Sequence, residues 1–392
     1  MKISEIKLRI IPDSRDKDTL EGILRSANLE ASGQVPSGKS TGKTEAAVVA
    51  PQKALEKVNW LNSQIKDHEF ATLEEFDHFL ISLDGTLNKQ NLGGNTILSL
   101  SMAFTRLLAK QAGVELFEMI SKISGNQVKL PFCFFNLIEG GVHAENSLPF
   151  QEYLFIPQVR SAKESLEMVT NTVKLLGDKI NKEYGSKEMG DEGGFTIAAQ
   201  DPLVGLQVLQ QLIDQDKLKG KIGLDVAASV LLKDGKYQAG DKSLSRQDLI
   251  DLYQKIADEF SVLSMEDPFD EEDWQGFSQL ASQIGDKIWI IGDDLLTTNV
   301  GRIQKAYQEQ AVNAVLIKPN QIGSVSETIQ AVNLAKSYGW KIVVSHRSGE
   351  TRDTFIADLA VGVGADGLKS GCPLQKERLV KYERLVEIES SL

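Results

Sequence analysis

Six ionisable residues each close a short apolar run in the second half of the chain. The runs are KIGLD, SVLSMED, IWIIGDD, NAVLIK, KIVVSH and ADGLK, and the residues in question are Asp225, Glu266, Asp293, Lys318, His346 and Lys369. Three carboxylates in succession, with no cysteine beside them, offer the oxygen ligands that a hard divalent ion such as Mg²⁺ prefers. The sequence therefore predicts a magnesium site flanked by lysine and histidine.

The two lysines add a possible base to this set. A lysine held near other cations and a metal has a lowered pKa, which lets it accept a proton near neutral pH. A metal, carboxylates and a lysine base together suit removal of a proton beside a substrate carboxylate, where the intermediate is a highly charged enolate. The lysines of this set could therefore bind or deprotonate an anionic substrate if the fold places them beside the metal.

The spacing of the six residues predicts the fold that brings them together. Successive members lie 41, 27, 25, 28 and 23 residues apart, lengths that fit one strand, a loop, a helix and the return to the next strand. In a closed (β/α)8-type barrel of parallel βα units, the carboxyl ends of the strands share one rim, where active sites lie. The fold class expected for residues 130–392 is therefore an α/β barrel.

The first 125 residues have a different pattern, which predicts an N-terminal α+β capping domain. The run IKLRII reads as a strand, and a loop rich in Gly and Ser follows at Gly33–Gly42. Apolar residues recur at helical spacing in KALEKVNWLNSQI, which predicts one helix there, and again at Ile97–Leu108. The expected domains are thus 1–125 and 130–392.

Composition excludes several classes of protein. The chain has 392 residues, two cysteines and a formal net charge of −12, so neither a disulfide framework nor a nucleic-acid-binding surface is expected. Its apolar runs are shorter than the roughly 20 residues of a membrane-spanning helix, and the N-terminus lacks an apolar signal core. We expect a cytoplasmic protein without a membrane span, acting on a small molecule.

Each residue taken singly also has a plainer interpretation. Asp225 could cap a helix and Glu266 could belong to a turn. Both lysines could lie on the surface. Outside this context Glu192 in GDEGG could be a solvated turn residue, and His143 could be a core histidine. The six residues at successive strand ends are not independent accidents, so the combined plain interpretation is weaker than any single one.

Longer blocks of the sequence resemble the enolase family along nearly the whole chain. VLIKPNQIGS at 315–324 resembles the family signature LLLKxNQIGT, and SHRSGET and GDEGGF are intact at 345–351 and 190–195. Further matches are MEDPF at 265–269, GDDL at 292–295, LDGT at 83–86 and PSGKSTG at 36–42. The resemblance implies an enolase barrel with an N-terminal cap, and a lyase that interconverts 2-phosphoglycerate and phosphoenolpyruvate in glycolysis.

The resemblance also implies a role for each matching residue. It implies two Mg²⁺ ions per active site, the first bound by Asp225, Glu266 and Asp293 and the second arriving with substrate at Ser40. Lys318 would remove the C2 proton, while Glu192 and its partner Glu152 would act on the C3 hydroxide. Lys369 would contact the substrate carboxylate, Arg347 and Ser348 would bind phosphate, Gln151 would lie beside Glu152, and His346 and His143 would be the two active-site histidines. The family also implies a homodimer or an assembly of dimers.

The chain departs from the family pattern at several positions. Asp16 replaces a glycine of DSRGNP, Lys39 stands beside Ser40, and IEGGVHA replaces INGGSHA through Glu139 and Val142. GDEGGF is followed by TIA in place of APN, and Pro319 follows the proposed base, a variation associated with archaeal-type enolases. We hypothesise that Lys39 and Glu139 pair across a closed loop. Another lyase of the superfamily and a catalytically impaired enolase-like binding protein remain alternatives.

Overall fold

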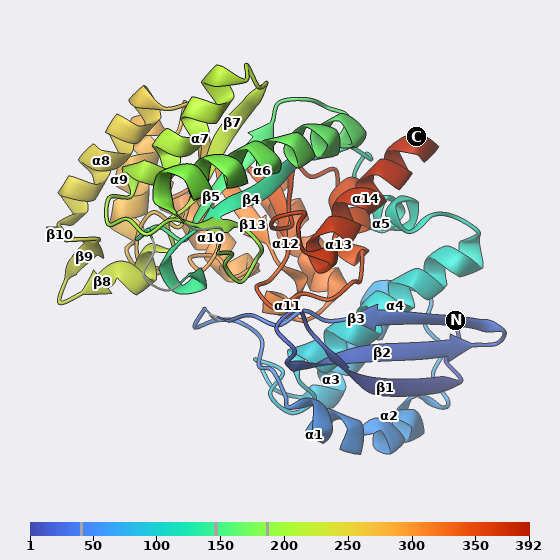
Figure 1. Ribbon diagram of the computed structural model, residues 1–392. Helices are drawn as coiled ribbons and strands as arrows, with labels where there is room; N and C mark the ends of the chain where they lie inside the picture. Colours follow the sequence, from blue (N-terminus) through green and yellow to red (C-terminus); the bar gives the residue numbers. More distant parts are fainter. Residues whose placement is uncertain (40–41, 145–147, 186–187) are drawn as a thin grey trace.

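The computed structural model describes residues 1–39, 42–144, 148–185 and 188–392. A small N-terminal sheet and its helices lie beside a larger barrel, and Figure 1 shows these two parts as the blue to cyan and the green to red regions. The expected fold class, an α/β barrel with an N-terminal α+β cap, is confirmed.

The N-terminal part is built on an antiparallel sheet in the order β1–β2–β3. Its strands are β1 (Glu5–Pro12), β2 (Asp18–Ser26) and β3 (Leu29–Gln34). The helices that follow are α1 (Pro51–Glu56), α2 (Val58–Ile65), α3 (Leu73–Asp84), α4 (Gly94–Ala112) and α5 (Leu116–Ser124). The long helix α4 packs against β2 and β3, so it supplies most of the apolar cover of this sheet.

The structure has two helices where the sequence pattern predicts one. The run KALEKVNWLNSQI is divided between α1 and α2 at Lys57, whose φ of −88° and ψ of −6° end the first helix. The Lys57 N–H is bonded to carbonyls within α1. Leu61 and Ile65 are buried in α2. The helical spacing of apolar residues continues across Lys57, so the sequence pattern does not reveal the break between the two helices.

The barrel closes with eight strands, because β15 pairs with β4 as well as with β14. In ring order the strands are β4 (Phe132–Glu139), β5 (Glu152–Pro157), β7 (Gly220–Asp225), β11 (Val262–Glu266), β12 (Trp289–Gly292), β13 (Ala314–Ile317), β14 (Lys341–Ser345) and β15 (Gly367–Lys369). Asp293, Lys318 and His346 each stand one residue beyond their strand. Closure places all six strand-end residues at one rim.

The expectation of uniformly parallel strands is wrong at β5. This strand pairs antiparallel with both β4 and β7. It therefore begins at the functional rim, where its first residue, Glu152, lies opposite Glu139 on one side and Asp225 on the other. The run EYLFIP is as apolar as a parallel strand, so its composition carries no sign of its direction.

Helices surround the barrel, and shorter elements decorate its rim. The helices are α6 (Ala162–Tyr184), α7 (Leu203–Gln215), α8 (Arg246–Glu259), α9 (Trp274–Ile284), α10 (Val300–Gln308), α11 (Pro319–Ile322), α12 (Val325–Ser337), α13 (Phe355–Gly362) and α14 (Lys376–Ser391). The short elements are η1 (Gly141–His143), β6 (Phe195–Thr196), η2 (Ala228–Leu231), β8 (Leu232–Lys233), β9 (Lys236–Ala239) and β10 (Lys242–Leu244). In the described ranges, no helix combines the length and apolarity needed to cross a membrane.

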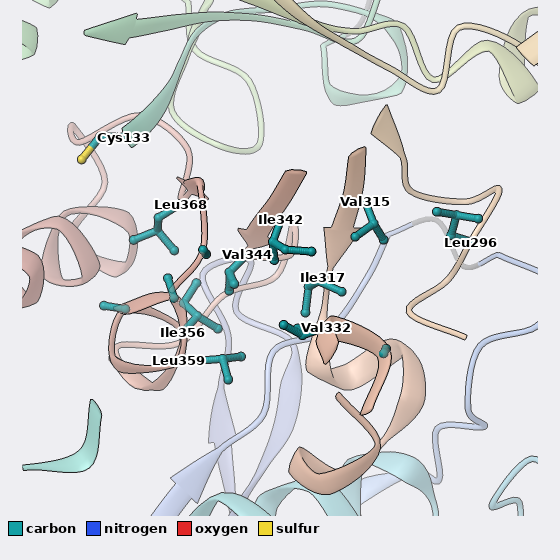
Figure 2. Packing of buried hydrophobic residues seen from close by; sticks show 14 of the residues in the cluster. Cys133, Leu296, Val315, Ile317, Val332, Ile342, Val344, Ile356, Leu359 and Leu368 are labelled. Atoms are coloured by element: carbon teal, nitrogen blue, oxygen red, sulfur yellow. The ribbon is translucent and has the colours of Figure 1, made fainter. Parts of the chain in front are cut away.

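Strand alternation divides the barrel core into two layers. Val315 and Ile317 on β13 belong to the outer cluster, where they pack with residues such as Val332 of α12, as Figure 2 shows. Ala314 and Leu316 belong to a separate inner cluster, because neighbouring side chains of a strand point to opposite faces. Apolar side chains therefore fill the barrel interior, and polar chemistry is confined to the rim.

Two glycines allow the N-terminal sheet to approach α4 closely. Gly22 and Gly33 are opposite each other in the β2–β3 register. A Cβ atom added to Gly33 would lie 2.5 Å from the carbonyl oxygen of Ser99, and one added to Gly22 would lie 2.5 Å from the Ser99 hydroxyl. The glycine pair therefore sets the distance between sheet and helix.

We predict that Gly33→Ala lowers the free energy of unfolding by about 1–3 kcal/mol, because the added methyl group meets helix backbone that cannot easily move. Urea denaturation followed by circular dichroism measures the change. Ser32→Ala is the matched control, since its side chain points to the opposite face of β3. Equal stability of the Gly33 variant and wild type would contradict the close packing.

Candidate active site

A pocket of about 50 Å³ opens at the functional rim of the barrel. The predicted site residues that line it are His143, Gln151, Glu152, Glu192, Asp225, Asp293, Lys318, His346, Arg347, Ser348 and Lys369. Glu266 does not line the pocket but lies buried beside it, bonded to Lys369. Ser40 lies outside the described residues. Side chains far apart in the sequence thus meet in one place.

Lys369 is the centre of one group of charges. Its ammonium lies 2.8 Å from Glu266 Oε2, 3.0 Å from Glu152 Oε2 and 3.3 Å from Asp225 Oδ2. Burial disfavours the charge, but the surrounding carboxylates outweigh burial and raise the pKa of Lys369 well above the ordinary value. Lys369 is therefore a fixed cation and does not suit the role of a base.

Lys318 is the centre of a second group. It caps the N-terminus of α11 with extended backbone, φ −125°, and Pro319 occupies the first helical turn. Proline fits there because that position needs no N–H donor, and it favours extended backbone in the residue before it. The departure at Pro319 therefore favours the extended backbone that Lys318 has at the end of β13.

The Lys318 ammonium forms an ion pair with Asp293 Oδ2, and Gln321 Nε2 donates to Asp293 Oδ1 over 2.9 Å. Burial would lower the pKa of Lys318, but the charge of Asp293 outweighs burial and raises it. In this arrangement the paired carboxylate dominates over the nearby cations, and the lowered lysine pKa expected beside a metal stays a prediction.

A chain of hydrogen bonds fixes Glu192. His346 Nε2 lies 3.1 Å from Glu192 Oε2, and Asn136 Nδ2 donates to the same oxygen over 3.2 Å. On the far side of the imidazole, Arg378 Nη1 lies 2.6 Å from His346 Nδ1. Because arginine only donates, Nδ1 must accept and Nε2 must carry the hydrogen that is donated to Glu192. Burial lowers the pKa of His346 to about 3, so the imidazole is neutral.

Glu152 and His143 complete this side of the pocket. His143 Nδ1 lies 3.6 Å from Glu152 Oε1 and 3.9 Å from Glu139 Oε2. Burial and the negative charge of Glu192 raise the pKa of Glu152 well above its ordinary value. Glu152 is therefore suited to hold a proton while Glu192 is charged.

Several carboxylates could hold a metal ion. Asp267, Asp293 and Asp294 offer oxygens within 4.8 Å of one another. Asp267 also accepts the backbone N–H groups of Asp293 (2.9 Å) and Asp294 (2.8 Å), which fixes the turn after β12. Asp225 and Glu266 both contact the same ammonium group, Lys369 Nζ. The predicted ligands therefore share the rim, with two ammonium groups lying among them.

Arg347 is held by a residue of the N-terminal part. Its guanidinium bonds to both carboxylate oxygens of Glu45, over 3.0 and 3.1 Å, and Nη1 donates to Asn320 Oδ1 over 3.0 Å. Ser348 Oγ accepts the backbone N–H of Lys39 over 2.8 Å. A bidentate carboxylate fixes the plane of an arginine, so Glu45 presents Arg347 to the pocket.

The hypothesised pair of Lys39 and Glu139 is wrong. Lys39 Nζ lies 2.7 Å from Asp191 Oδ2 and donates to the Val142 carbonyl over 2.8 Å. Glu139 is fully buried and binds backbone N–H groups of Glu192 and Gly194. Lys39 and Glu139 thus each bind a different part of the same loop, residues 190–194.

The departure at Asp16 lies at a backbone conformation that glycine adopts readily. Asp16 has a φ of +55°, which is the left-handed region. Aspartate tolerates this region better than most residues. The substitution therefore leaves the turn geometry available.

Several residues that organise the site were not among those predicted from the sequence. Arg378 lies on α14 in the run KERLVKYERL, which reads as a solvated helix surface, yet its side chain is fully buried. Nothing near Glu45 marks it as a partner of Arg347. Asp267 had a signal, since it directly follows Glu266 in MEDPF. Only contacts between distant segments reveal the other two.

Comparison with known proteins decides the family. Residues 3–120 match the family model described as "Enolase, N-terminal domain", and residues 127–392 match "Enolase, C-terminal TIM barrel domain". The chain belongs to the enolase family. It is therefore a lyase of the enolase type, and the resemblance found in the sequence blocks is confirmed.

Curated relatives agree along the full length of the chain. The chain is 40% identical to Enolase 2 of Hevea brasiliensis over 423 residues and 41% identical to Enolase B of Dictyostelium discoideum over 422. It is 41% identical to Enolase of Solanum lycopersicum over 425 residues. Each comparison covers 100% of this chain and 95% of the relative.

We predict that His346 stays neutral, with its hydrogen on Nε2, from about pH 5 to pH 8, because burial holds its pKa far below this range. Nitrogen-15 NMR of the four histidines measures both the tautomer and the titration. The signal that disappears in His346→Asn assigns the residue. A midpoint near the ordinary histidine value, or a hydrogen on Nδ1, would contradict the bond to Arg378.

Proposed function

We propose that this pocket catalyses the reversible dehydration of 2-phosphoglycerate to phosphoenolpyruvate. The observation that carries the proposal is that Lys318, the Glu152 and Glu192 carboxyl groups, and the cations Lys369 and Arg347 all line one pocket. The reaction needs a base for C2, a proton donor for the C3 hydroxide, and cations for the two anionic groups of the substrate. Each of these requirements has a candidate here.

Lys318 is the proposed base that takes the C2 proton. Its Nζ must be neutral to accept that proton, yet its ion pair with Asp293 favours the charged form. The mechanism therefore requires the charge of Asp293 to be shared with another cation in the loaded enzyme. This requirement links the base directly to the proposed metal site.

The residues of that metal site fit a hard divalent ion. Asp225, Glu266 and Asp293 offer only oxygen. Glu266 Oε1 is a buried acceptor that has no hydrogen-bond partner among the described residues, and a cation would satisfy it. We propose Mg²⁺ there, and a second Mg²⁺ that arrives with substrate at Ser40. When bound, the ions would stabilise the negative charge that grows on the substrate carboxylate as C2 loses its proton.

Glu192 and Glu152 are the proposed groups for the hydroxide step. The two carboxyl groups and His143 each offer one polar atom, and these atoms lie within 4.8 Å of one another. Since two buried carboxylates so close cannot both be charged without large cost, they share a proton. That proton can pass to the departing hydroxide, while neutral His346 keeps Glu192 aligned.

The substrate anions have two separate sets of partners. We assign the phosphate to Arg347 and Ser348, which follow β14, and the carboxylate to Lys369 on β15. Gln151 donates to Asp225 Oδ2 over 3.3 Å and so lies beside the carboxylate end. Arginine held flat by Glu45 is suited to bidentate contact with phosphate.

The wider setting follows the family. We propose a cytoplasmic enzyme of glycolysis that assembles as a homodimer or as a set of dimers. We also propose the domain division 1–125 and 130–392. In support of that division, α5 ends at Ser124, and Gly125 caps it with a φ of 73°.

An assay of phosphoenolpyruvate formation from 2-phosphoglycerate, with and without a chelator, separates the alternatives. The proposal expects turnover that disappears with chelator and returns with Mg²⁺. Another lyase of the superfamily would leave 2-phosphoglycerate unchanged while retaining metal binding. An impaired binding protein would bind the substrate without turnover.

We predict that Lys318→Ala loses both turnover and exchange of the C2 hydrogen with solvent, because both need the base. Glu192→Gln should lose turnover while exchange continues, since C2 is deprotonated before hydroxide leaves. Proton NMR in heavy water follows the exchange. Normal exchange in the Lys318 variant would remove this residue from the role of base.

We predict that Asp293→Ala weakens binding of the first Mg²⁺. Loss of a residue that only hydrogen-bonds to a metal ligand reduces metal affinity by about 10- to 100-fold. Loss of a ligand itself should reduce the affinity at least as much. Isothermal calorimetry measures the affinity, with Asp286→Ala, an exposed carboxylate, as the control. Unchanged affinity in the Asp293 variant would show that the ion binds elsewhere.

A further inference from the structure

Glu139 lies under the loop that carries Glu192. Its side chain stands at the end of β4, is fully buried, and points into residues 190–194. The Glu192 N–H donates to both carboxylate oxygens over 3.1 and 3.2 Å, and the Gly194 N–H donates to Oε1 over 2.5 Å. One carboxylate therefore satisfies two backbone donors of the catalytic loop.

The loop and Glu139 fit each other closely. A Cβ atom on Gly190 would lie 2.4 Å from Glu139 Oε2, and one on Gly194 would lie 3.0 Å from Oε1. A smaller side chain at this position would leave space under the loop. It would also leave two buried N–H groups without acceptors, at a cost of about 1–3 kcal/mol each.

Other contacts hold the loop from its opposite side. The Cys372 N–H donates to the Glu192 carbonyl over 3.0 Å, and Gln375 Nε2 donates to the Asp191 carbonyl over 3.2 Å. Lys39 pairs with Asp191, as described above. On the barrel side, β6 pairs with β4 and the Asp191 N–H donates to the His143 carbonyl over 3.2 Å, and Glu139 is the side chain there that binds the Glu192 and Gly194 N–H groups.

We infer that Glu139 is a positioning residue that aligns Glu192 for departure of the hydroxide. It acts through the Glu192 and Gly194 backbone, and it is not one of the described residues that line the pocket. The inference rests on the proposed dehydration, because only that reaction separates a Glu192 step from a Lys318 step. Glu139 stands where the family motif INGGSHA has asparagine, so the carboxylate that binds these N–H groups is one of the departures of this chain from that motif.

The experiment compares turnover with C2 hydrogen exchange in the full-length enzyme. Glu139→Ala removes both acceptors, and we expect turnover to fall by about 10- to 100-fold, as for other small displacements of a reacting group. Glu139→Gln keeps the shape and one acceptor, so its turnover should lie between those of Glu139→Ala and wild type. Exchange should stay within about twofold of wild type in both variants, because Lys318 is untouched.

The matched control is Asp77→Asn. Asp77 is likewise a buried carboxylate that accepts a backbone N–H, that of Ser326 over 2.9 Å, but it lies outside the pocket. In Asp77→Asn, the turnover rate and the rate of C2 hydrogen exchange should both stay within about twofold of wild type. A control that loses turnover selectively would overturn the inference, because the effect would then not be specific to the Glu192 loop.

The outcomes separate the inference from the proposed function. If turnover and exchange fall together in Glu139→Gln, or if neither changes, Glu139 does not position Glu192. If Glu139→Ala fails to fold, the Gln variant alone decides in the same way. If wild type shows neither turnover of 2-phosphoglycerate nor exchange, the proposed function fails before any variant is compared.

Discussion

The site depends on mutual neutralisation of charges that the closed barrel buries at its rim. Lys369 contacts Glu152, Asp225 and Glu266, and Lys318 pairs with Asp293. Removal of one partner from such a group leaves an uncompensated buried charge, which costs several kcal/mol. The reversed direction of β5 is part of this balance, because it brings Glu152 beside Asp225. A substitution of one of these charged side chains is therefore expected to affect both the stability of the barrel and the chemistry of the site.

The N-terminal part completes the site through its loop. Glu45 fixes Arg347, the Lys39 N–H bonds to Ser348, and Arg15 Nη1 donates to Ser348 Oγ over 3.4 Å. The proposed phosphate binders are thus held by residues from the other part of the chain. Such contacts couple the cap to the barrel, so movement of the loop would alter the geometry of Arg347 and Ser348 together.

The strand-end residues could be predicted because local pattern determines them: an apolar run that ends in a charge gives both the strand and its rim. Pairings between segments could not be predicted. The sequence did not show that β5 is reversed, that Lys39 reaches Asp191 instead of Glu139, or that Arg378 is buried. The raised pKa of Lys318 was missed for the same reason, since its cause is contact with Asp293, on a neighbouring strand end.

The central claim is that the barrel rim binds a divalent ion with carboxylates that the lysines otherwise neutralise. Anomalous diffraction from crystals grown with Mn²⁺, which shares the oxygen preference of Mg²⁺, tests it most directly. The account predicts a peak bounded by Asp225, Glu266 and Asp293, with Lys318 no longer paired to Asp293. A peak held instead by Asp267, Asp293 and Asp294, with Lys369 still bound to Asp225 and Glu266, would contradict it.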